Sequence, residues 1–331
     1  MADVVTAERL LEPILSLHTS IRDAVVDACT RQTPEQLAID ATGSSDAGDT
    51  IYAIDRVGEE ALVPGLSELA HNEPVCVVAE GMLDPLILPP GARESDCRWR
   101  LLVDPLDGTR GLMYQKRSAW ILTGVAPNRG AATRLSDVVL AVQTEVPLLK
   151  QHLSDQLWAL RGKGMTARRG NRLTRATEPV TLRRSASDTI AHGFATVVRF
   201  FPGARETLGA IDDEVVQKLV KAERGRAACF EDQYASTGGQ LYELMAGHDR
   251  FVADLRPLVQ SGGLCCHPYD LCTALIALEA GVILTGPGGA PLDAPFDLPS
   301  DVAWVGYANE GLRRSIEPVL QEALRRRGLL R

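Results

Sequence analysis

Apolar positions recur every three or four residues in several stretches of this chain, which is the spacing of a helix with one buried face. In the N-terminal stretch these positions are Leu10, Leu11, Ile14, Leu17, Ile21 and Val25. A second helix is predicted from Ile54 to Leu69, with a break or kink where Pro64 and Gly65 interrupt it. Further helices are predicted over residues 206–223, 239–246, 270–280 and 310–326.

Short apolar runs without helical spacing lie between these helices and predict strands. They cover residues 74–80, 100–104, 119–125, 138–142, 156–161, 193–201, 250–253 and 302–307. The strands occur in runs with helices between the runs, which favours an α+β fold of stacked layers over a regular βαβ series. A polar stretch near residues 176–186 separates two sheet-forming regions, so we expect two halves, residues 1–180 and 181–331.

Composition and charge exclude several classes of protein. The formal net charge is −8, so a general surface for nucleic acid is not expected. No apolar run reaches the length of a membrane span, and the N-terminal residues do not have the layout of a signal peptide. The seven cysteines have irregular spacing, which does not indicate a disulfide framework. We therefore expect a cytoplasmic protein, and an anionic small substrate would need a metal ion or a local basic pocket.

The segment that begins at Asp104 and reads DPLDGT holds the strongest candidate for chemistry. Asp104 ends an apolar strand, and Pro105 favours an extended backbone there, so that a turn can bring Asp107 back beside it. Gly108 lets the backbone approach a ligand closely, and Thr109 is expected to cap a following helix whose first N–H groups suit an anion. Carboxylate oxygens and phosphate oxygens together suit Mg²⁺. Taken alone, the same residues also fit an ordinary surface turn.

Three further carboxylates lie at the predicted ends of elements. Glu80 ends the 74–80 strand, Asp270 begins the 270–280 helix, and Asp55 begins the 54–69 helix. Each has a plain alternative, because a loop Glu is usually solvated and an Asp at a helix start is usually an N-cap. Together with Asp104 and Asp107 they predict a cation site between strand ends and a helix start.

Other motifs are weaker. The six histidines include no pair four residues apart, which argues against zinc, and the glycine-rich segment 286–289 lacks the lysine of a nucleotide-binding loop. Arg110 follows Thr109 and could reach a phosphate, although a solvated arginine fits equally well. His267 precedes Asp270 and could contact a substrate or simply lie in a loop. Ser236 and Thr237 could face a substrate or cap a helix.

These motifs, in this order, resemble the inositol monophosphatase-like superfamily, which includes inositol phosphatases, fructose-1,6-bisphosphatases and 3′-phosphonucleotide phosphatases. The family motif Asp-Pro-Ile/Leu-Asp-Gly-Thr/Ser matches residues 104–109 at every position. The segments 157–164, 269–274 and 288–293 resemble its Gly-Lys-Gly hairpin, its Trp-Asp-x-Ala-Ala-Gly motif and its Gly-Gly-Pro-Phe-Asp turn. The likeness runs from about residue 49 to residue 308, and it implies a layered αβαβα fold with a metal site between two sheet-containing halves.

The resemblance also implies roles for individual residues and identifies expected ligands. The metal ligands would be Glu80, Asp104, the Leu106 carbonyl, Asp107 and Asp270. The catalytic residues would be Glu80, Thr109 and Asp55, and the substrate-binding residues would be Gly108, Thr109, Arg110, Ser236, Thr237 and His267. The implied cofactor is Mg²⁺ as two or three ions, with Mn²⁺ as an alternative and Li⁺ and Ca²⁺ as inhibitors. The implied partners are a small phosphorylated substrate and a second copy in a homodimer, with no nucleic acid and no membrane.

The chain departs from the family pattern at a few positions. Gly81 stands where the family has the second Glu of Gly-Glu-Glu, and Tyr52 replaces a Thr that precedes the first-helix Asp. Gly263 stands where inositol phosphatases have a substrate-binding Glu, and the segment before Asp270 is longer. We therefore expect a Mg²⁺-dependent phosphatase acting on a phosphate monoester of a sugar, polyol or nucleotide. The alternative is a catalytically decayed relative that binds metal or phosphosugar without turnover.

Overall fold

The computed structural model describes residues 2–39, 52–70, 73–82, 84–260 and 265–331. The α-helices are α1 (Ala2–Ala7), α2 (Leu11–Arg31), α3 (Pro34–Leu37), α4 (Ala53–Leu69), α5 (Thr109–Met113), α6 (Arg205–Leu219), α7 (Thr237–Ala246), α8 (Ala274–Glu279) and α9 (Glu310–Arg326). The 3₁₀ helices are η1 (Glu8–Leu10), η2 (Glu94–Asp96), η3 (Gly130–Ala132), η4 (Leu135–Asp137) and η5 (Arg256–Leu258). The strands are β1 (Val75–Ala79), β2 (Leu86–Leu88), β3 (Trp99–Asp107), β4 (Ala119–Pro127), β5 (Leu140–Val146), β6 (Leu153–Leu160), β7 (Met165–Asn171), β8 (Thr177–Val180), β9 (Phe194–Val197), β10 (Asp249–Asp254), β11 (Ile283–Thr285) and β12 (Trp304–Tyr307).

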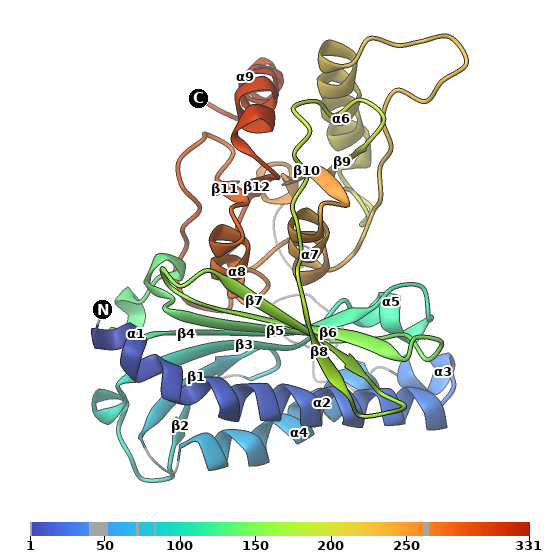
Figure 1. Ribbon diagram of the computed structural model, residues 1–331. Coiled ribbons are helices and arrows are strands. Elements are labelled where there is room, and N and C mark those ends of the chain that lie inside the picture. The colour runs from blue at the N-terminus through green and yellow to red at the C-terminus, as the bar shows by residue number, and fades with distance from the viewer. Residues whose placement is uncertain (1, 40–51, 71–72, 83, 261–264) are drawn as a thin grey trace.

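Two sheets and three layers of helices make up the described part of the chain (Figure 1). The larger sheet has the strand order β2-β1-β3-β4-β5-β6-β7-β8, in which β1 and β3 are parallel and the other neighbours are antiparallel. The smaller sheet has the order β11-β12-β10-β9. Helices α2 and α4 cover one face of the larger sheet, α7 and α8 lie between the sheets, and α6 and α9 cover the smaller sheet. This αβαβα layering confirms the predicted α+β fold.

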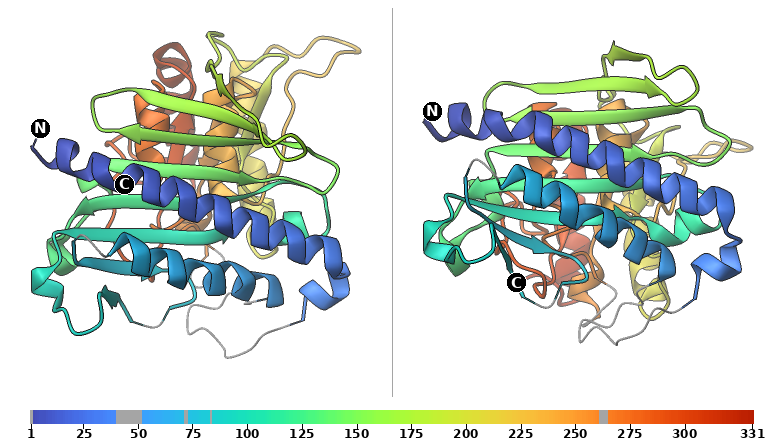
Figure 2. Two further views of the ribbon diagram at one scale, coloured as in Figure 1. Left: turned by 60° about the horizontal axis from the view of Figure 1, so that its bottom comes forward. Right: turned by 90° about the horizontal axis from the view of Figure 1, so that it is seen from below.

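The apolar stripe of the first helix explains how the outer layer is held. Its members Ile14, Ile21 and Val25 are fully buried against the larger sheet. Helix α2 crosses the sheet obliquely with α4 alongside it (Figure 2). At Gly65 an added Cβ would lie 2.5 Å from a Leu17 methyl group, so glycine allows α4 to approach α2 closely.

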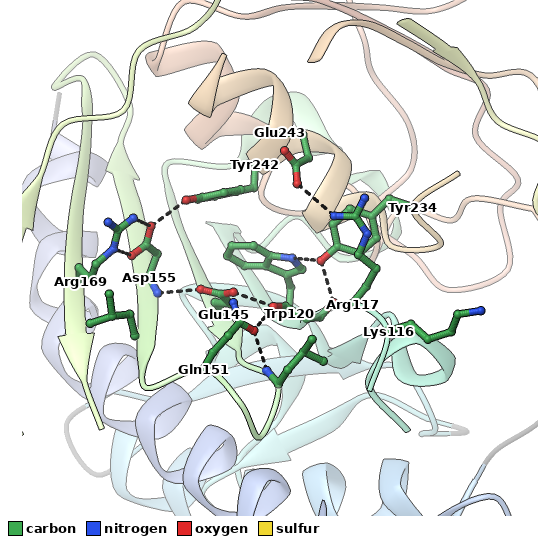
Figure 3. Close-up of a pocket in the computed structure, with 13 residues that line it drawn as sticks. Lys116, Arg117, Trp120, Glu145, Gln151, Asp155, Arg169, Tyr234, Tyr242 and Glu243 are labelled. Carbon is green, nitrogen blue, oxygen red and sulfur yellow. Dashed lines mark hydrogen bonds and ion pairs between the residues drawn. The ribbon is translucent and has the colours of Figure 1, made fainter. Parts of the chain in front are cut away.

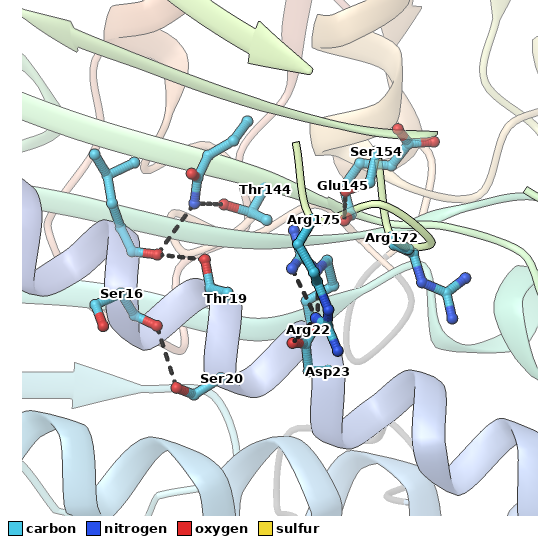
Figure 4. Close-up of polar contacts among 12 residues, drawn as sticks. Ser16, Thr19, Ser20, Arg22, Asp23, Thr144, Glu145, Ser154, Arg172 and Arg175 are labelled. Carbon is cyan, nitrogen blue, oxygen red and sulfur yellow. Dashed lines mark hydrogen bonds and ion pairs between the residues drawn. The ribbon is translucent and has the colours of Figure 1, made fainter. Parts of the chain in front are cut away.

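A polar contact also joins α2 to the larger sheet. The His18 ring is fully buried, with Nε2 at 2.8 Å from the Thr123 hydroxyl and Nδ1 at 3.0 Å from the Thr144 hydroxyl. Gln156 donates from Nε2 to the same Thr144 hydroxyl and to the Leu15 carbonyl (Figure 4). Burial lowers the pKa of His18 to about 3, so the imidazole is neutral in the folded protein at neutral pH.

The structure differs from two of the helix predictions. Helix α4 continues without a break through Pro64, because Pro64 and Glu60 both lie on its exposed side, where water can bond the Glu60 carbonyl that loses its helical partner. The predicted helix from residue 270 begins only at Ala274. The polar stretch at residues 41–49 lies outside the described residues. Within those residues, none of the helices combines the length and apolar composition that crossing a bilayer would need.

Candidate metal centre

The end of strand β3 brings two carboxylates to the same side of the larger sheet. Asp104 pairs with Leu122 of β4, and Asp107 pairs with Trp120, so three steps along β3 match two steps along β4. Side chains three residues apart on a regular strand point to opposite faces, and the extra residue of this bulge turns Asp107 back to the side of Asp104. The turn predicted between the two aspartates is therefore a bulge inside the strand.

Asp104, Asp107 and Asp270 form one cluster, in which one oxygen from each carboxylate lies within 4.8 Å of the others. Asp104 is 1% exposed and Asp107 is 7% exposed, while Asp270 is half-buried. Asp270 lies in the turn before α8, where its Oδ2 accepts a 2.6 Å hydrogen bond from the backbone N–H of His267. Thr273, and not Asp270, is the residue before the helix, so the simple N-cap interpretation of Asp270 was wrong.

Neutral donors hold the two aspartates of β3. Oδ1 of Asp104 accepts from the backbone N–H of Leu106 at 2.9 Å. Oδ2 of Asp107 accepts from the Ser236 hydroxyl at 2.8 Å and from the N–H of Gly238 at 2.6 Å. Ser236 is also the N-cap of α7, where its Oγ accepts from Gly239. The start of α7 therefore fixes Asp107 across the interface between the two sheets.

Burial and mutual repulsion make this cluster unfavourable without a counter-charge. The pKa of Asp104 is raised well above its usual range by burial and then by Glu80, Asp107 and Asp270. Burial and the charge of Asp270 raise the pKa of Asp107 to about 7, although hydrogen bonds from Ser236 and Gly238 oppose this. A divalent cation would remove the repulsion, and an all-oxygen donor set is the set that Mg²⁺ prefers. The residues present fit such an ion.

Glu80 reaches the cluster because β1 and β3 are parallel and in register. Ala79 pairs with Val103, so the next residues along each strand, Glu80 and Asp104, are level with one another. The N–H of Glu80 donates to the Val103 carbonyl at 3.0 Å. Glu80 is half-buried, and its charge is one cause of the raised pKa of Asp104.

Thr109 and Asp55 lie together at the start of two helices. Gly108, with φ of 94°, is the N-cap of α5, so Thr109 is the first helical residue and the predicted capping role for it was wrong. The Thr109 Oγ lies 2.7 Å from Oδ1 of Asp55 and 2.8 Å from the Leu106 carbonyl oxygen. Asp55 is the third residue of α4, and its other oxygen accepts from the N–H of Tyr52 at 2.7 Å. Asp55 thus joins α4 to residues 104–109, which are called the metal loop below.

Two arginines flank an aromatic ring near this loop. The guanidinium carbon of Arg110 lies 5.3 Å from the Tyr52 ring centre and 5.4 Å from that of Phe201. The guanidinium carbon of Arg256, in η5, lies 4.4 Å from the Phe200 ring centre and 5.5 Å from that of Phe201. Phe201 therefore contacts Arg110, which follows a strand of the larger sheet, and Arg256, which follows a strand of the smaller sheet.

Arg256 forms a buried ion pair with Asp254, the last residue of β10. Its Nε donates to Oδ1 of Asp254 at 2.8 Å, and both side chains are almost fully buried. Burial acts to lower the pKa of Arg256, but Asp254 and the charge of Asp270 outweigh it and raise that pKa above its ordinary value. Sequence reasoning did not identify Asp254, Arg256, Phe200 or Phe201. The only available signal was an Asp-x-Arg sequence at a strand end in the extended segment.

The other predicted residues have mainly structural contacts. His267 is buried and stacks on Tyr269 with 5.2 Å between ring centres, and its Nδ1 lies 3.1 Å from the Ser300 carbonyl oxygen. Thr237 is buried with its hydroxyl 3.7 Å from the Cys266 sulfur. Gly263 lies outside the described residues.

A separate pocket of about 410 Å³ lies beside Trp120, and none of the predicted site residues lines it (Figure 3). Its buried Asp155 is already bonded by Arg169 and by the Tyr242 hydroxyl. The Trp120 indole N–H donates to the Tyr234 hydroxyl, which donates to the Ser118 carbonyl. These contacts pair the buried polar groups of the pocket with one another.

Comparison with known proteins shows the fold. No protein-family model matches the sequence, and no curated protein sequence does. A hypothetical protein of Pyrococcus horikoshii with similarities to inositol-1 monophosphatase gives a TM-score of 0.63 at 16% identity, over 95% of this chain and 98% of that one. Leishmania major fructose-1,6-bisphosphatase, in its holo form, gives 0.68 at 12% identity, over 93% of each chain. The extragenic suppressor protein SuhB of Bartonella henselae gives 0.66 at 17% identity, over 95% of this chain and 99% of that one.

Proposed function

From the premise that this chain has the fold of the inositol monophosphatase-like superfamily, as its motifs predicted, we propose that it is a Mg²⁺-dependent phosphatase. The substrate would be a phosphate monoester of a small sugar, polyol or nucleotide. The observation that carries the proposal is the convergence of Asp104, Asp107 and Asp270 within 4.8 Å, with Glu80 level with Asp104. Buried like charges of this kind are costly unless a cation is bound.

The metal ligands proposed are Glu80, Asp104, the Leu106 carbonyl, Asp107 and Asp270, for two or three ions. All are hard oxygen donors, which suit Mg²⁺ and also Mn²⁺, and Li⁺ and Ca²⁺ are proposed as inhibitors. When bound, such cations would neutralise phosphate oxygens and lower the pKa of a water molecule, so that it can give up a proton and attack phosphorus at neutral pH. Ser236 and Gly238 would keep Asp107 oriented while the site is loaded.

Thr109 and Asp55 are proposed to accept the proton of the attacking water, with Glu80 as a second base. The Thr109 hydroxyl has one proton and two acceptors within 2.8 Å, Asp55 and the Leu106 carbonyl. A lone pair of the hydroxyl oxygen is therefore left to accept a proton from water, and the hydroxyl proton can pass to Asp55. The backbone N–H groups of Gly108 and Thr109 are proposed to bind the phosphate.

The leaving group would lie on the side of Arg110, Phe201 and Arg256. The Arg110 guanidinium would favour a leaving group that carries negative charge over a neutral polyol, whereas the charge of Arg256 is already paired with Asp254. His267 and Thr237 remain proposed substrate contacts, and Ser236 is proposed to act through Asp107.

A panel of phosphate monoesters tests the proposal. Sugar phosphates, sugar bisphosphates, inositol phosphates and 3′-phosphonucleotides would be incubated with Mg²⁺ and the released phosphate measured, with Li⁺ added in a parallel series. We expect Mg²⁺-dependent release from at least one ester, inhibition by Li⁺, and no release by the Asp104→Asn variant. If no ester is hydrolysed while Mn²⁺ still binds, the chain is the decayed relative that binds metal without turnover.

The halves 1–180 and 181–331, a cytoplasmic location and a homodimer remain predictions. The homodimer is tested by light scattering coupled to size-exclusion chromatography, for which a single species of twice the 35.7 kDa chain mass is expected.

A further inference from the structure

The side chain of Gln143, on strand β5, is fully buried and lies on the same face of the larger sheet as the metal centre. Gln143 pairs with Leu122 of β4, and Leu122 pairs with Asp104 of β3. Residues directly opposite one another on antiparallel strands point to the same face of a sheet, so Gln143 shares the face of Asp104. Its other neighbour in this row is Leu157 of β6. An amide therefore stands between two leucines in the row that begins with Asp104.

The nitrogen of this amide bonds the segment that fixes Asp107 in the metal loop. Nε2 of Gln143 donates to the carbonyl oxygen of Gly238 at 2.8 Å, and the N–H of Gly238 donates to Oδ2 of Asp107 at 2.6 Å. An added Cβ on Gly238 would lie 3.0 Å from the same Asp107 oxygen, so the start of α7 is packed directly against the carboxylate. One residue thus separates Gln143 from Asp107.

The oxygen of the amide bonds the turn that carries Asp270. Oε1 of Gln143 accepts from the hydroxyl of Thr273 at 3.0 Å, and Thr273 is fully buried. Thr273 is the last residue of the turn 268–273, which backbone hydrogen bonds tie together, and Asp270 lies in the middle of that turn. A single side chain of the larger sheet therefore bonds the segments that hold two of the three clustered carboxylates.

These two segments need a link because their carboxylates repel each other. One oxygen of Asp107 and one of Asp270 lie within 4.8 Å, and the two residues come from different elements of the chain. Repulsion between like charges at this distance acts to separate α7 and the metal loop from the turn before α8. A buried amide costs more than a leucine in an apolar row unless its hydrogen bonds are made, and both ends of Gln143 are bonded.

We propose that Gln143 is a positioning residue of the metal centre, which holds Asp107 and Asp270 at the separation that one cation needs by bonding Gly238 and Thr273. The inference rests on the proposed function, because it needs a divalent ion that both carboxylates bind. Hydrogen bonds outside the direct ligands orient those ligands, and their loss lowers metal affinity.

The test compares Gln143→Leu with Gln156→Leu. Gln156 is also a buried amide of the larger sheet, on the neighbouring strand β6, but it donates to the Leu15 carbonyl of α2, on the opposite face. Both replacements therefore remove one buried amide, and only the first removes a link to the metal centre. Binding of Mn²⁺ is measured by isothermal titration calorimetry. We expect Gln143→Leu to weaken it by roughly 10-fold and Gln156→Leu to change it by less than about 2-fold.

The double variant Gln143→Leu/Thr273→Val separates positioning from stability. Gln143→Leu takes away the partner of the buried Thr273 hydroxyl, which lowers stability whatever else the amide does. Removal of that hydroxyl should recover part of this loss, as measured by urea denaturation in EDTA. The Mn²⁺ affinity of the double variant should stay as low as that of Gln143→Leu, because the link between the two segments is still absent.

Unchanged Mn²⁺ affinity in Gln143→Leu, or an equal loss in Gln156→Leu, would overturn the inference. Recovery of the affinity together with the stability in the double variant would overturn it too, since Gln143 would then act only through the fold. The titration needs no turnover. A wild type that binds Mn²⁺ and hydrolyses no ester contradicts the proposed function, and the variants still decide the role of Gln143. Absence of Mn²⁺ binding by the wild type would overturn both.

Discussion

The two sides of the proposed centre handle buried charge in opposite ways. On the side of the larger sheet, Asp104 and Asp107 are buried with other carboxylates, and their hydrogen-bond donors are N–H groups and a hydroxyl. On the side of the smaller sheet, buried Asp254 is paired with Arg256. The first side needs protons or a cation from solution to relieve its repulsion, while the second supplies its own cation. This contrast supports the proposal that the first side binds a metal, because the charges of the second side are already paired with one another.

Removal of one carboxylate from the side of the larger sheet, called the metal side below, should have the largest effect on activity. Asp104→Asn keeps the shape of the side chain and should lower phosphate release by about 1000-fold or more, because several kcal/mol of charge stabilisation in the transition state is lost. The metal-free variant should be at least as stable to urea as the wild type, since it has less repulsion. Asp84→Asn, at an exposed position, is the control and should keep its activity. Near-wild-type turnover by Asp104→Asn would mean that this carboxylate cluster takes no part in the reaction.

Removal of one partner of the ion pair should destabilise the side of the smaller sheet. Arg256→Met leaves Asp254 buried without its cation and should lower the free energy of unfolding by about 3–5 kcal/mol. The double variant Asp254→Leu/Arg256→Met removes both charges and should recover most of this loss. Urea denaturation of the three proteins measures it. An unchanged stability in Arg256→Met would mean that Asp254 is solvated, and the contrast between the two sides would fail.

The Thr109 hydroxyl, on the metal side, is expected to contribute to the rate of the reaction. Thr109→Val keeps the volume but removes the group that bridges Asp55 and the Leu106 carbonyl, so kcat should fall by roughly 100-fold. Thr109→Ser keeps the hydroxyl and should remain within about 5-fold of the wild type. Steady-state kinetics at saturating Mg²⁺ separate the two variants. Similar losses in both would indicate a packing role for the Thr109 methyl group.

The pH dependence of stability should show the repulsion directly. The pKa of Asp107 is raised to about 7, so its protonated form favours the folded protein, and this contribution is lost as the pH rises through 7. Between pH 6 and pH 8, the metal-free wild type should lose about 1 kcal/mol more stability than Asp107→Asn. Urea denaturation in EDTA measures the difference. With saturating Mg²⁺ the trend should reverse, because the ion binds the deprotonated carboxylates.

Local sequence was sufficient for the long helices and the central strands, and it indicated the kind of ligand. The stripe that includes Ile14 and Ile21 predicts α2, because helical periodicity is a property of neighbouring residues. The apolar runs before Glu80 and Asp104 predict strands that end in carboxylates, and the DPLDGT motif indicates hard oxygen ligands. These features depend on residues close together in the chain, and for that reason they can be recognised without the fold.

How the carboxylates are held, and which other residues lie beside them, depends on the tertiary structure. The bulge that aligns Asp107 with Asp104 depends on pairing with β4, and Ser236 reaches Asp107 from 129 residues away. Gln143 bonds Gly238 and Thr273 because α7 and the turn before α8 pack on the larger sheet, and no spacing in the sequence predicts those contacts. Register and helix packing are set by the burial of whole faces against distant segments, so they cannot be read from a local pattern.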